Sequence, residues 1–163
     1  MIEVNDFRNA MSRLTGAVNV ITTAGSSGRY GFTASAVCSV TDTPPTLLVC
    51  MNKNSQSHPY FLENKVLTVN VLGSQHQQIS QAFSSKLTAE ERFNHGEWSA
   101  LETGSPVLAD ALVSFDCKID QIQDVGTHAI FICQITAIQQ SENGQGLVYF
   151  DRAYHPVGQS QHS

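Results

Sequence analysis

The sequence predicts a mainly β domain, an all-β barrel or sandwich that carries only short helices. Apolar runs of strand length recur along the chain, and turn residues separate them at hairpin spacing. No strand–helix–strand alternation, internal repeat or low-complexity segment interrupts this pattern. With 163 residues, the chain is expected to form one domain with a buried core.

The N-terminal part predicts a helix followed by a β-hairpin. Asn5 or Asp6 can cap the helix, in which apolar residues recur at helical spacing until Gly16 ends it. A strand over 17–23 and a turn at 25–28 then lead into a second strand over 31–40.

The strand predicted over 31–40 has a polar face without any charge. With a side-chain period of two, one face holds Phe32, Ala34, Ala36, Cys38 and Val40, and the other holds Thr33, Ser35, Val37, Ser39 and Thr41. The first face suits a core. The second is a neutral wall of short hydrogen-bonding groups, as a planar ligand needs. An ordinary sandwich strand whose hydroxyls pair with a neighbour is an equal alternative.

The rest of the chain continues as strands with short helical insertions. Strands are expected over 46–51, 66–72, 107–108, 111–125, 129–140 and 147–150, with turns at 126–127 and 142–144. Short helices are expected after Ser57 and over 75–83, and a capping box at 88–91 starts another.

Composition limits the function classes. The net charge of -5, without any cluster of Lys and Arg, argues against a nucleic-acid binder. Charged residues make up 14%, against about 25% in average soluble proteins, which favours an oligomer interface. The sequence shows no signal peptide and no run long enough to span a bilayer, so a cytoplasmic location is expected. The four cysteines lie in strand-like runs and are expected to be free core residues.

Two groups of residues could carry chemistry. Lys53, Ser55 and Ser57 can bind an anion, although a capped helix beside a solvated lysine is the simpler interpretation. His128 follows the 126–127 turn and can hydrogen-bond a ligand or donate to a developing negative charge; a turn histidine paired with the backbone is the alternative.

Metal and direct acid–base chemistry are not expected. The six histidines lack metal-ligand spacing. Asp116, Asp120 and Asp124 recur on one strand and are expected to be solvated. No nucleophile motif or convincing carboxylate pair is present, so an enzymatic reaction would need a cofactor.

Several runs resemble the short-chain flavin reductases. These runs are 7–12 (FRNAMS), 20–23 (VITT), 31–40 (GFTASAVCSV), 45–50 (PTLLVC), 69–72 (VNVL), 126–128 (GTH) and 154–156 (YHP). They follow the family's order from about residue 7 to 157. Within the family, the reductase component of two-component 4-hydroxyphenylacetate 3-monooxygenases is most similar. The flavin reductase of the pyrimidine-degrading monooxygenase system is a near second.

The resemblance implies a fold and an activity. The fold is a homodimeric, FMN-binding split β-barrel of Greek-key type over 1–158, followed by a disordered tail over 159–163. Such proteins bind FMN or FAD and oxidise NADH, or NADPH in its place. Hydride passes from nicotinamide C4 to flavin N5, and the reduced flavin leaves for a separate oxygenase.

The resemblance also implies the site residues. The flavin-binding residues are Thr33, Ala34, Ser35, Ala36, Ser39, Val40, Cys50, Met51, Asn52, Lys53, Ser55, Ser57, Phe83, Ser84 and Lys86. The residues expected near the nicotinamide are Arg92, Phe93, His128 and Tyr154, with His128 as the catalytic residue. A non-catalytic flavin-binding module is the alternative of another class. An oxidase of the pyridoxamine-phosphate type is disfavoured because Lys and Arg are few.

Overall fold

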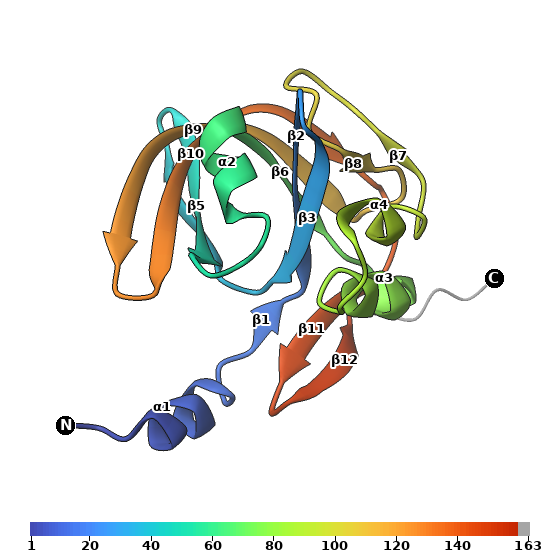
Figure 1. Ribbon diagram of the computed structural model, residues 1–163. Helices are drawn as coiled ribbons and strands as arrows, with labels where there is room; N and C mark the ends of the chain where they lie inside the picture. The colour runs from blue at the N-terminus through green and yellow to red at the C-terminus, as the bar shows by residue number, and fades with distance from the viewer. Residues whose placement is uncertain (160–163) are drawn as a thin grey trace.

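The computed structural model describes residues 1–159 and is built around one curved antiparallel sheet (Figure 1). In spatial order its strands are β3 (Gly28–Ala34), β2 (Asn19–Gly25), β6 (Val66–Val71), β9 (Val113–Val125), β10 (His128–Gln140), β5 (Pro45–Asn52) and β4 (Val37–Asp42). A smaller sheet contains β1 (Gly16–Ala17), β11 (Gly146–Phe150) and β12 (Ala153–Val157), and β7 (Trp98–Ser99) pairs with β8 (Val107–Leu108). The helices are short: α1 (Val4–Met11), α2 (His58–Asn64), the 3-10 turn η1 (Ser74–His76), α3 (Gln77–Ala82) and α4 (Ala89–Arg92). The predicted mainly β class is confirmed.

The sheet curls because its two edge strands are consecutive in the chain. Only Ser35 and Ala36 separate β3 from β4, so the edges come together at one end without pairing. Helix α2 lies at the gap between β3 and β5 (Figure 1). Its Phe61 is fully buried and stacks on Phe131 of β10 with ring centroids 6.2 Å apart. The result has the form of a split barrel.

Strand β2 is buried on both faces and separates two cores. Ile21 packs inside the barrel with Phe61, whereas its neighbour Val20 packs outside with Phe83 and Leu108. Adjacent strand residues point to opposite faces. Burying each such side chain contributes about 1.5–3 kcal/mol. The outer core fixes α3 and α4 against β3.

The 31–40 stretch is not one strand, and the predicted alternation fails after Ala34. The bend at Ser35–Ala36 reverses which residues of the strand alternation face the core, so that Val37 packs against the inner core. Cys38 and Val40 were expected on the core face but are exposed, Val40 by 51%.

Helix α1 forms as predicted but has different ends. Glu3 occupies the N-cap position, no side chain caps the helix, and Gly16 lies in β1 rather than at the helix terminus. None of its residues is buried, and Phe7 and Met11 are 57% and 45% exposed. In Figure 1 it stands away from the barrel. Its apolar face therefore has no partner in the described part of the chain.

Asp116 is fully buried, contrary to the expected solvated face, whereas Asp120 and Asp124 are exposed. Its carboxylate accepts from the backbone N–H groups of Glu102 and Thr103, each at 2.8 Å, and from the Thr68 hydroxyl at 3.0 Å. These bonds pin the segment between β7 and β8.

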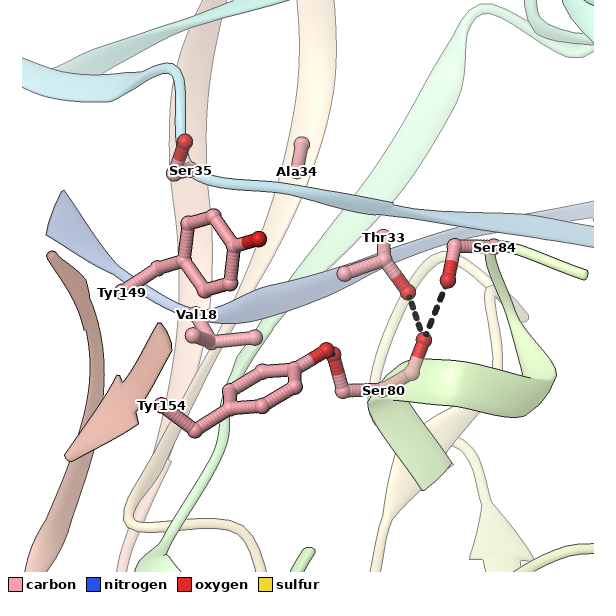
Figure 2. A pocket seen from close by; sticks show the side chains of 8 residues that line it. All are labelled: Val18, Thr33, Ala34, Ser35, Ser80, Ser84, Tyr149 and Tyr154. Carbon is pink, nitrogen blue, oxygen red and sulfur yellow. Dashed lines mark hydrogen bonds between the residues drawn. The ribbon is translucent and has the colours of Figure 1, made fainter. Parts of the chain in front are cut away.

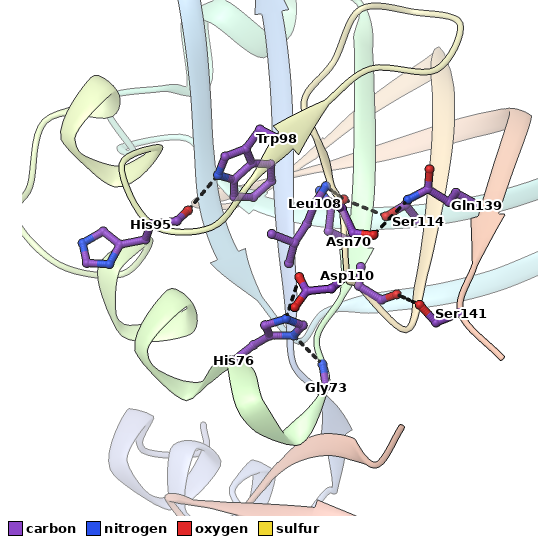
Figure 3. A network of polar contacts seen from close by, with 12 residues as sticks. Asn70, Gly73, His76, His95, Trp98, Leu108, Asp110, Ser114, Gln139 and Ser141 are labelled. Atoms are coloured by element: carbon purple, nitrogen blue, oxygen red, sulfur yellow. Dashed lines mark hydrogen bonds and ion pairs between the residues drawn. The ribbon is translucent and has the colours of Figure 1, made fainter. Parts of the chain in front are cut away.

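Asn70 anchors the end of the same segment. Its Oδ1 accepts from the Leu108 N–H at 2.9 Å and from the Ser114 hydroxyl at 2.8 Å (Figure 3). Nearby, His76 Nδ1 accepts from the Gly73 N–H and Nε2 lies 3.0 Å from Asp110. Buried polar groups thus join the barrel to the α3 region.

The cysteines are free, but only two are core residues. Cys117 and Cys133 are buried, Cys50 is half-buried and Cys38 is exposed. Cys38 departs from the prediction because of the phase shift at Ser35–Ala36.

Local predictions agree with the structure at two turns and one cap, but not at the ends of α1 or at Ser57, which occupies the N-cap position of α2 without a side-chain hydrogen bond. The 25–28 and 126–127 turns form hairpins, and Thr88 caps α4 by accepting from the Glu91 N–H. Strand β12 was not predicted, because its Pro156 is tolerated only on an edge strand. Of the tail expected to be disordered, residues 160–163 lie outside the described residues. Within 1–159, no helix is long and apolar enough to cross a membrane, and no His, Cys, Asp and Glu side chains group as metal ligands.

Candidate functional site

Two neighbouring cavities lie between β3 and the segment that runs from α3 to α4. The first, of about 250 Å³, is lined by Val18, Thr33, Ala34, Ser35, Ser80, Ser84, Tyr149 and Tyr154 (Figure 2). The second, of about 880 Å³, is lined by Tyr30, Gly31, Ser55, Gln56, Ser57, Tyr60, Ser85, Lys86, Leu87, Thr88, Ala89 and Arg92. Ser84 belongs to one cavity and Ser85 to the other, so the two cavities are adjacent.

One wall of the first cavity is organised by the backbone carbonyl of Ser80. This carbonyl is in the last turn of α3, where helical carbonyls lack partners within the helix. It accepts from the Thr33 hydroxyl at 2.7 Å and from the Ser84 hydroxyl at 3.0 Å (Figure 2). Both hydroxyl protons are donated to the Ser80 carbonyl, so Thr33 and Ser84 can offer only lone pairs to a ligand in the cavity.

The opposite wall comes from the β11–β12 hairpin. Tyr149 and Tyr154 face each other across this hairpin, with ring centroids 5.2 Å apart. The Tyr154 hydroxyl lies 2.8 Å from Ser80 Oγ (Figure 2). The first cavity is thus neutral, with aromatic faces on one side and hydroxyls on the other.

The second cavity is cationic. Ser55 and Ser57 bring two hydroxyls within 3.2 Å of each other, and Lys86 and Arg92 supply positive charge. The Arg92 guanidinium donates to the Gly31 and Ser85 carbonyls, each at 2.7 Å, while its buried Nε has no hydrogen-bond partner among residues 1–159. Burial lowers the pKa of Arg92 from its usual value, although arginine stays protonated in proteins.

Tyr30 and Tyr60 form an aromatic edge to this cavity. Their rings stack with centroids 3.7 Å apart. The Tyr60 hydroxyl and, to a lesser degree, burial raise the pKa of Tyr30, which keeps its phenol neutral. The first cavity offers neutral polar groups and aromatic rings, and the second offers positive charge and hydroxyls. Together they fit a ligand with an uncharged ring system and a phosphate, as a flavin nucleotide has.

Comparison with known proteins agrees with this chemistry. Residues 11–158 match the family model described as flavin reductase like domain. This chain belongs to the flavin reductase-like family. The family match covers both cavities and the whole barrel.

Several relatives of this flavin reductase-like chain are named "FMN reductase (NADH) RutF". The Pantoea ananatis protein is 56% identical over 156 residues, which cover 96% of this chain and 82% of that protein. The protein of Escherichia coli O6:K15:H31 is 52% identical, with 96% of both chains covered.

Solved structures share the fold. A Haemophilus somnus 129PT protein assigned as a flavin reductase is 52% identical, with a TM-score of 0.94 over 96% of this chain and all of that one. The flavin reductase PheA2 is 28% identical, with a TM-score of 0.87 over 97% of this chain and 100% of the other.

The two cavities bring together nine of the residues that the sequence analysis assigned to a site. Thr33, Ala34, Ser35, Ser84 and Tyr154 line the first cavity, and Ser55, Ser57, Lys86 and Arg92 line the second. Arg92 was expected near the nicotinamide, but it lines the second, cationic cavity together with Lys86.

The other expected residues line neither cavity. Met51, Phe83 and Phe93 are buried core side chains, and the Phe83 carbonyl accepts from the Thr33 N–H at 3.2 Å. These three residues can support the site only by packing beneath the lining residues or through backbone hydrogen bonds.

The remaining expected residues lie near β4 and the end of the β9–β10 hairpin. Ser39 and Val40 are exposed on β4, and Ala36 accepts from the Cys50 N–H at 3.0 Å. His128 is exposed opposite Asn52, with Nδ1 2.9 Å from the Thr127 hydroxyl. Lys53 Nζ lies 3.9 Å from Asp124. These groups form a surface rather than a cavity wall.

Sequence reasoning missed several lining residues. Val18, Ser80 and Tyr149 line the first cavity, and Tyr30, Gly31, Gln56, Tyr60, Ser85, Leu87, Thr88 and Ala89 line the second. Tyr149 could have been found from its place across the turn from Tyr154. Ser80 has no comparable indication, because its partner is 74 residues away in the chain.

Proposed function

We propose that this NADH-dependent flavin reductase moves hydride from NADH to FMN or FAD in the first cavity and releases the reduced flavin to a separate oxygenase. One observation carries the proposal: a neutral, hydroxyl-lined cavity adjoins a cationic one. Hydroxyl and backbone contacts hold a flavin less firmly than buried charge pairs would, which suits a flavin that must leave.

The residues of the two cavities have separable roles. Bound flavin supplies a ring that accepts hydride from the nicotinamide. Thr33 and Ser84 accept hydrogen bonds from ligand N–H groups, because their own protons are donated to Ser80. Lys86 and Arg92, with the paired hydroxyls of Ser55 and Ser57, bind the phosphate. Tyr154 approaches the nicotinamide from the hairpin side.

A homodimer would complete the site. Ser39, Val40, Cys50, Asn52, Lys53 and His128, assigned to flavin or nicotinamide binding, lie outside the two cavities. Exposed apolar side chains occur on α1, at Phe7 and Met11, and on the β9–β10 hairpin, at Ile122 and Val125. We infer that a second copy covers this apolar surface and brings the outlying residues to the ligand.

Sedimentation tests the homodimer. The purified chain is expected to sediment as a dimer at working concentration, and a Phe7→Glu change in α1 should weaken the dimer. A monomeric wild-type protein would contradict the inference.

The named relatives favour a partner oxygenase of the pyrimidine-degrading system over a 4-hydroxyphenylacetate hydroxylase. The similarity to the 4-hydroxyphenylacetate reductases is not confirmed, whereas relatives above 50% identity carry the RutF name. A similar fold also occurs in BorF, named as the flavin reductase component of a two-component tryptophan halogenase, at 25% identity and a TM-score of 0.90. For either partner, the proposed role of this chain is to supply reduced flavin to a second component.

Measuring the release of reduced flavin distinguishes a flavin reductase from a non-catalytic protein that only stores flavin. The protein is mixed anaerobically with excess NADH and a large excess of FMN, and the solution is then ultrafiltered. We expect reduced FMN in the filtrate at many equivalents per protein. Reduction that stops at one flavin per chain, with the flavin retained above the membrane, would contradict the proposed release.

A further inference from the structure

Ser80 joins the two walls of the first cavity. It is fully buried, and it uses its backbone and its side chain toward opposite walls. Its carbonyl binds the hydroxyls of Thr33 and Ser84, while its hydroxyl contacts Tyr154 at 2.8 Å. Figure 2 shows Ser80 between these groups.

The contact with Tyr154 matters because β12 is an edge strand. Within residues 1–159, strand β12 pairs only with β11, and β11 pairs with the two-residue strand β1. Tyr154 is half-buried: its ring packs against the outer core and lies edge-on to Tyr149, whereas its hydroxyl is held by the contact with Ser80. Ser80, by contrast, is in a helix that is fixed by the outer core through Ala82 and Phe83.

We propose that Ser80 is a positioning residue for the nicotinamide side of the site: its hydroxyl holds the Tyr154 phenol at a fixed distance from the hydroxyls of Thr33 and Ser84. The inference rests on the proposed function, in which Tyr154 approaches the nicotinamide. The proposed role of Ser80 is exerted through Tyr154 and not on the reacting atoms themselves.

The test is a double-mutant cycle. Ser80→Ala removes the hydroxyl and leaves the carbonyl contacts in place, and Tyr154→Phe removes the other partner. Each change should raise KM for NADH by about 3- to 10-fold, the effect of one lost hydrogen bond. Flavin affinity and kcat should change by less than about twofold. The double variant should be no worse than the more affected single variant.

Ser114→Ala is the matched control. Ser114 is also fully buried and its hydroxyl donates to Asn70 at 2.8 Å, but it lines neither cavity. This change should lower stability without raising KM for NADH. A purely structural role for Ser80 would make the two serine variants behave alike.

A second readout needs no flavin and no turnover. The chain has four tyrosines, so tyrosine ring ¹³C NMR gives few signals, and Tyr154→Phe identifies one of them. Ser80→Ala should shift the Tyr154 signal and leave those of Tyr30 and Tyr60 in place, whereas Ser114→Ala should shift none.

Three outcomes would overturn the inference: an unmoved Tyr154 signal in Ser80→Ala, independent effects that multiply in the double variant, or equal losses of NADH and flavin affinity. A wild-type chain that oxidises no NADH would instead defeat the proposed function, and the NMR result would still decide whether Ser80 holds Tyr154.

Discussion

The hydroxyl oxygens of Ser55 and Ser57 lie 3.2 Å apart at the entrance to α2, in the same cavity as Lys86 and Arg92. Two hydroxyls and two cations in one cavity match the oxygens and charge of a phosphate. The neighbouring cavity has no charged lining residue. The phosphate and the ring of a flavin nucleotide therefore have separate places, and variants can distinguish them.

Ser55→Ala should weaken FMN and FAD binding by about 3- to 10-fold, because one hydrogen bond to the phosphate is lost. Riboflavin, which has no phosphate, should bind as it does to the wild type. Fluorescence titration with the three flavins measures this effect. Ser26→Ala, in the exposed β2–β3 turn, is the matched control. Equal losses for all three flavins would place the phosphate elsewhere.

His128→Ala should lower NADH turnover by at least about tenfold if the imidazole assists hydride transfer. FMN affinity should fall much less. Because His128 is exposed, the free energy of unfolding should change by less than about 0.5 kcal/mol. Steady-state kinetics and flavin titration give the two values, with His95→Ala as the control outside both cavities. Similar losses in turnover and in flavin affinity would make His128 a scaffold residue.

Asp116→Asn should destabilise the fold by about 2–4 kcal/mol. The amide cannot accept from every donor that the buried carboxylate serves, since one oxygen becomes an NH2 group that faces N–H and O–H donors. Urea unfolding measures the loss. Asp120→Asn, exposed on the same strand, should change the free energy of unfolding by less than about 0.5 kcal/mol. Equal effects of the two changes would argue against the buried network.

The four thiols should react with a disulfide reagent in a fixed order. Cys38 is exposed and should react first, and half-buried Cys50, whose pKa burial raises, should react more slowly. Burial raises the pKa of Cys133 to about 12 and raises that of Cys117 as well. Both thiols therefore stay protonated at pH 8 and should react only on unfolding. More than two fast-reacting thiols in the folded protein would contradict the structure.

The sequence predicts best what is decided locally. The turn at 25–28 and the Thr88 cap depend on residues within a few positions of each other, and both form as expected. Thr33 and Ser35 of the predicted hydroxyl wall line the first cavity, but the strand alternation fails after Ala34. A two-residue bend between sheet edges is set by how the barrel closes, and no local preference indicates it.

Tertiary contacts explain the other differences. Asp116 has the alternation of a solvated face, yet the segment between β7 and β8 folds over it and supplies its donors. Ser80 and Tyr154 meet only because α3 packs beside the β11–β12 hairpin. For His128 the turn was predicted correctly, but the side chain lines neither cavity.

The rate of NADH oxidation with FMN, FAD and riboflavin in parallel tests the proposed reductase activity most directly. The purified chain should consume NADH only when flavin is added, seen as falling absorbance of the reduced nicotinamide. The KM for FMN and for FAD should be lower than the KM for riboflavin. The absence of flavin-dependent consumption with both NADH and NADPH would contradict the proposed activity.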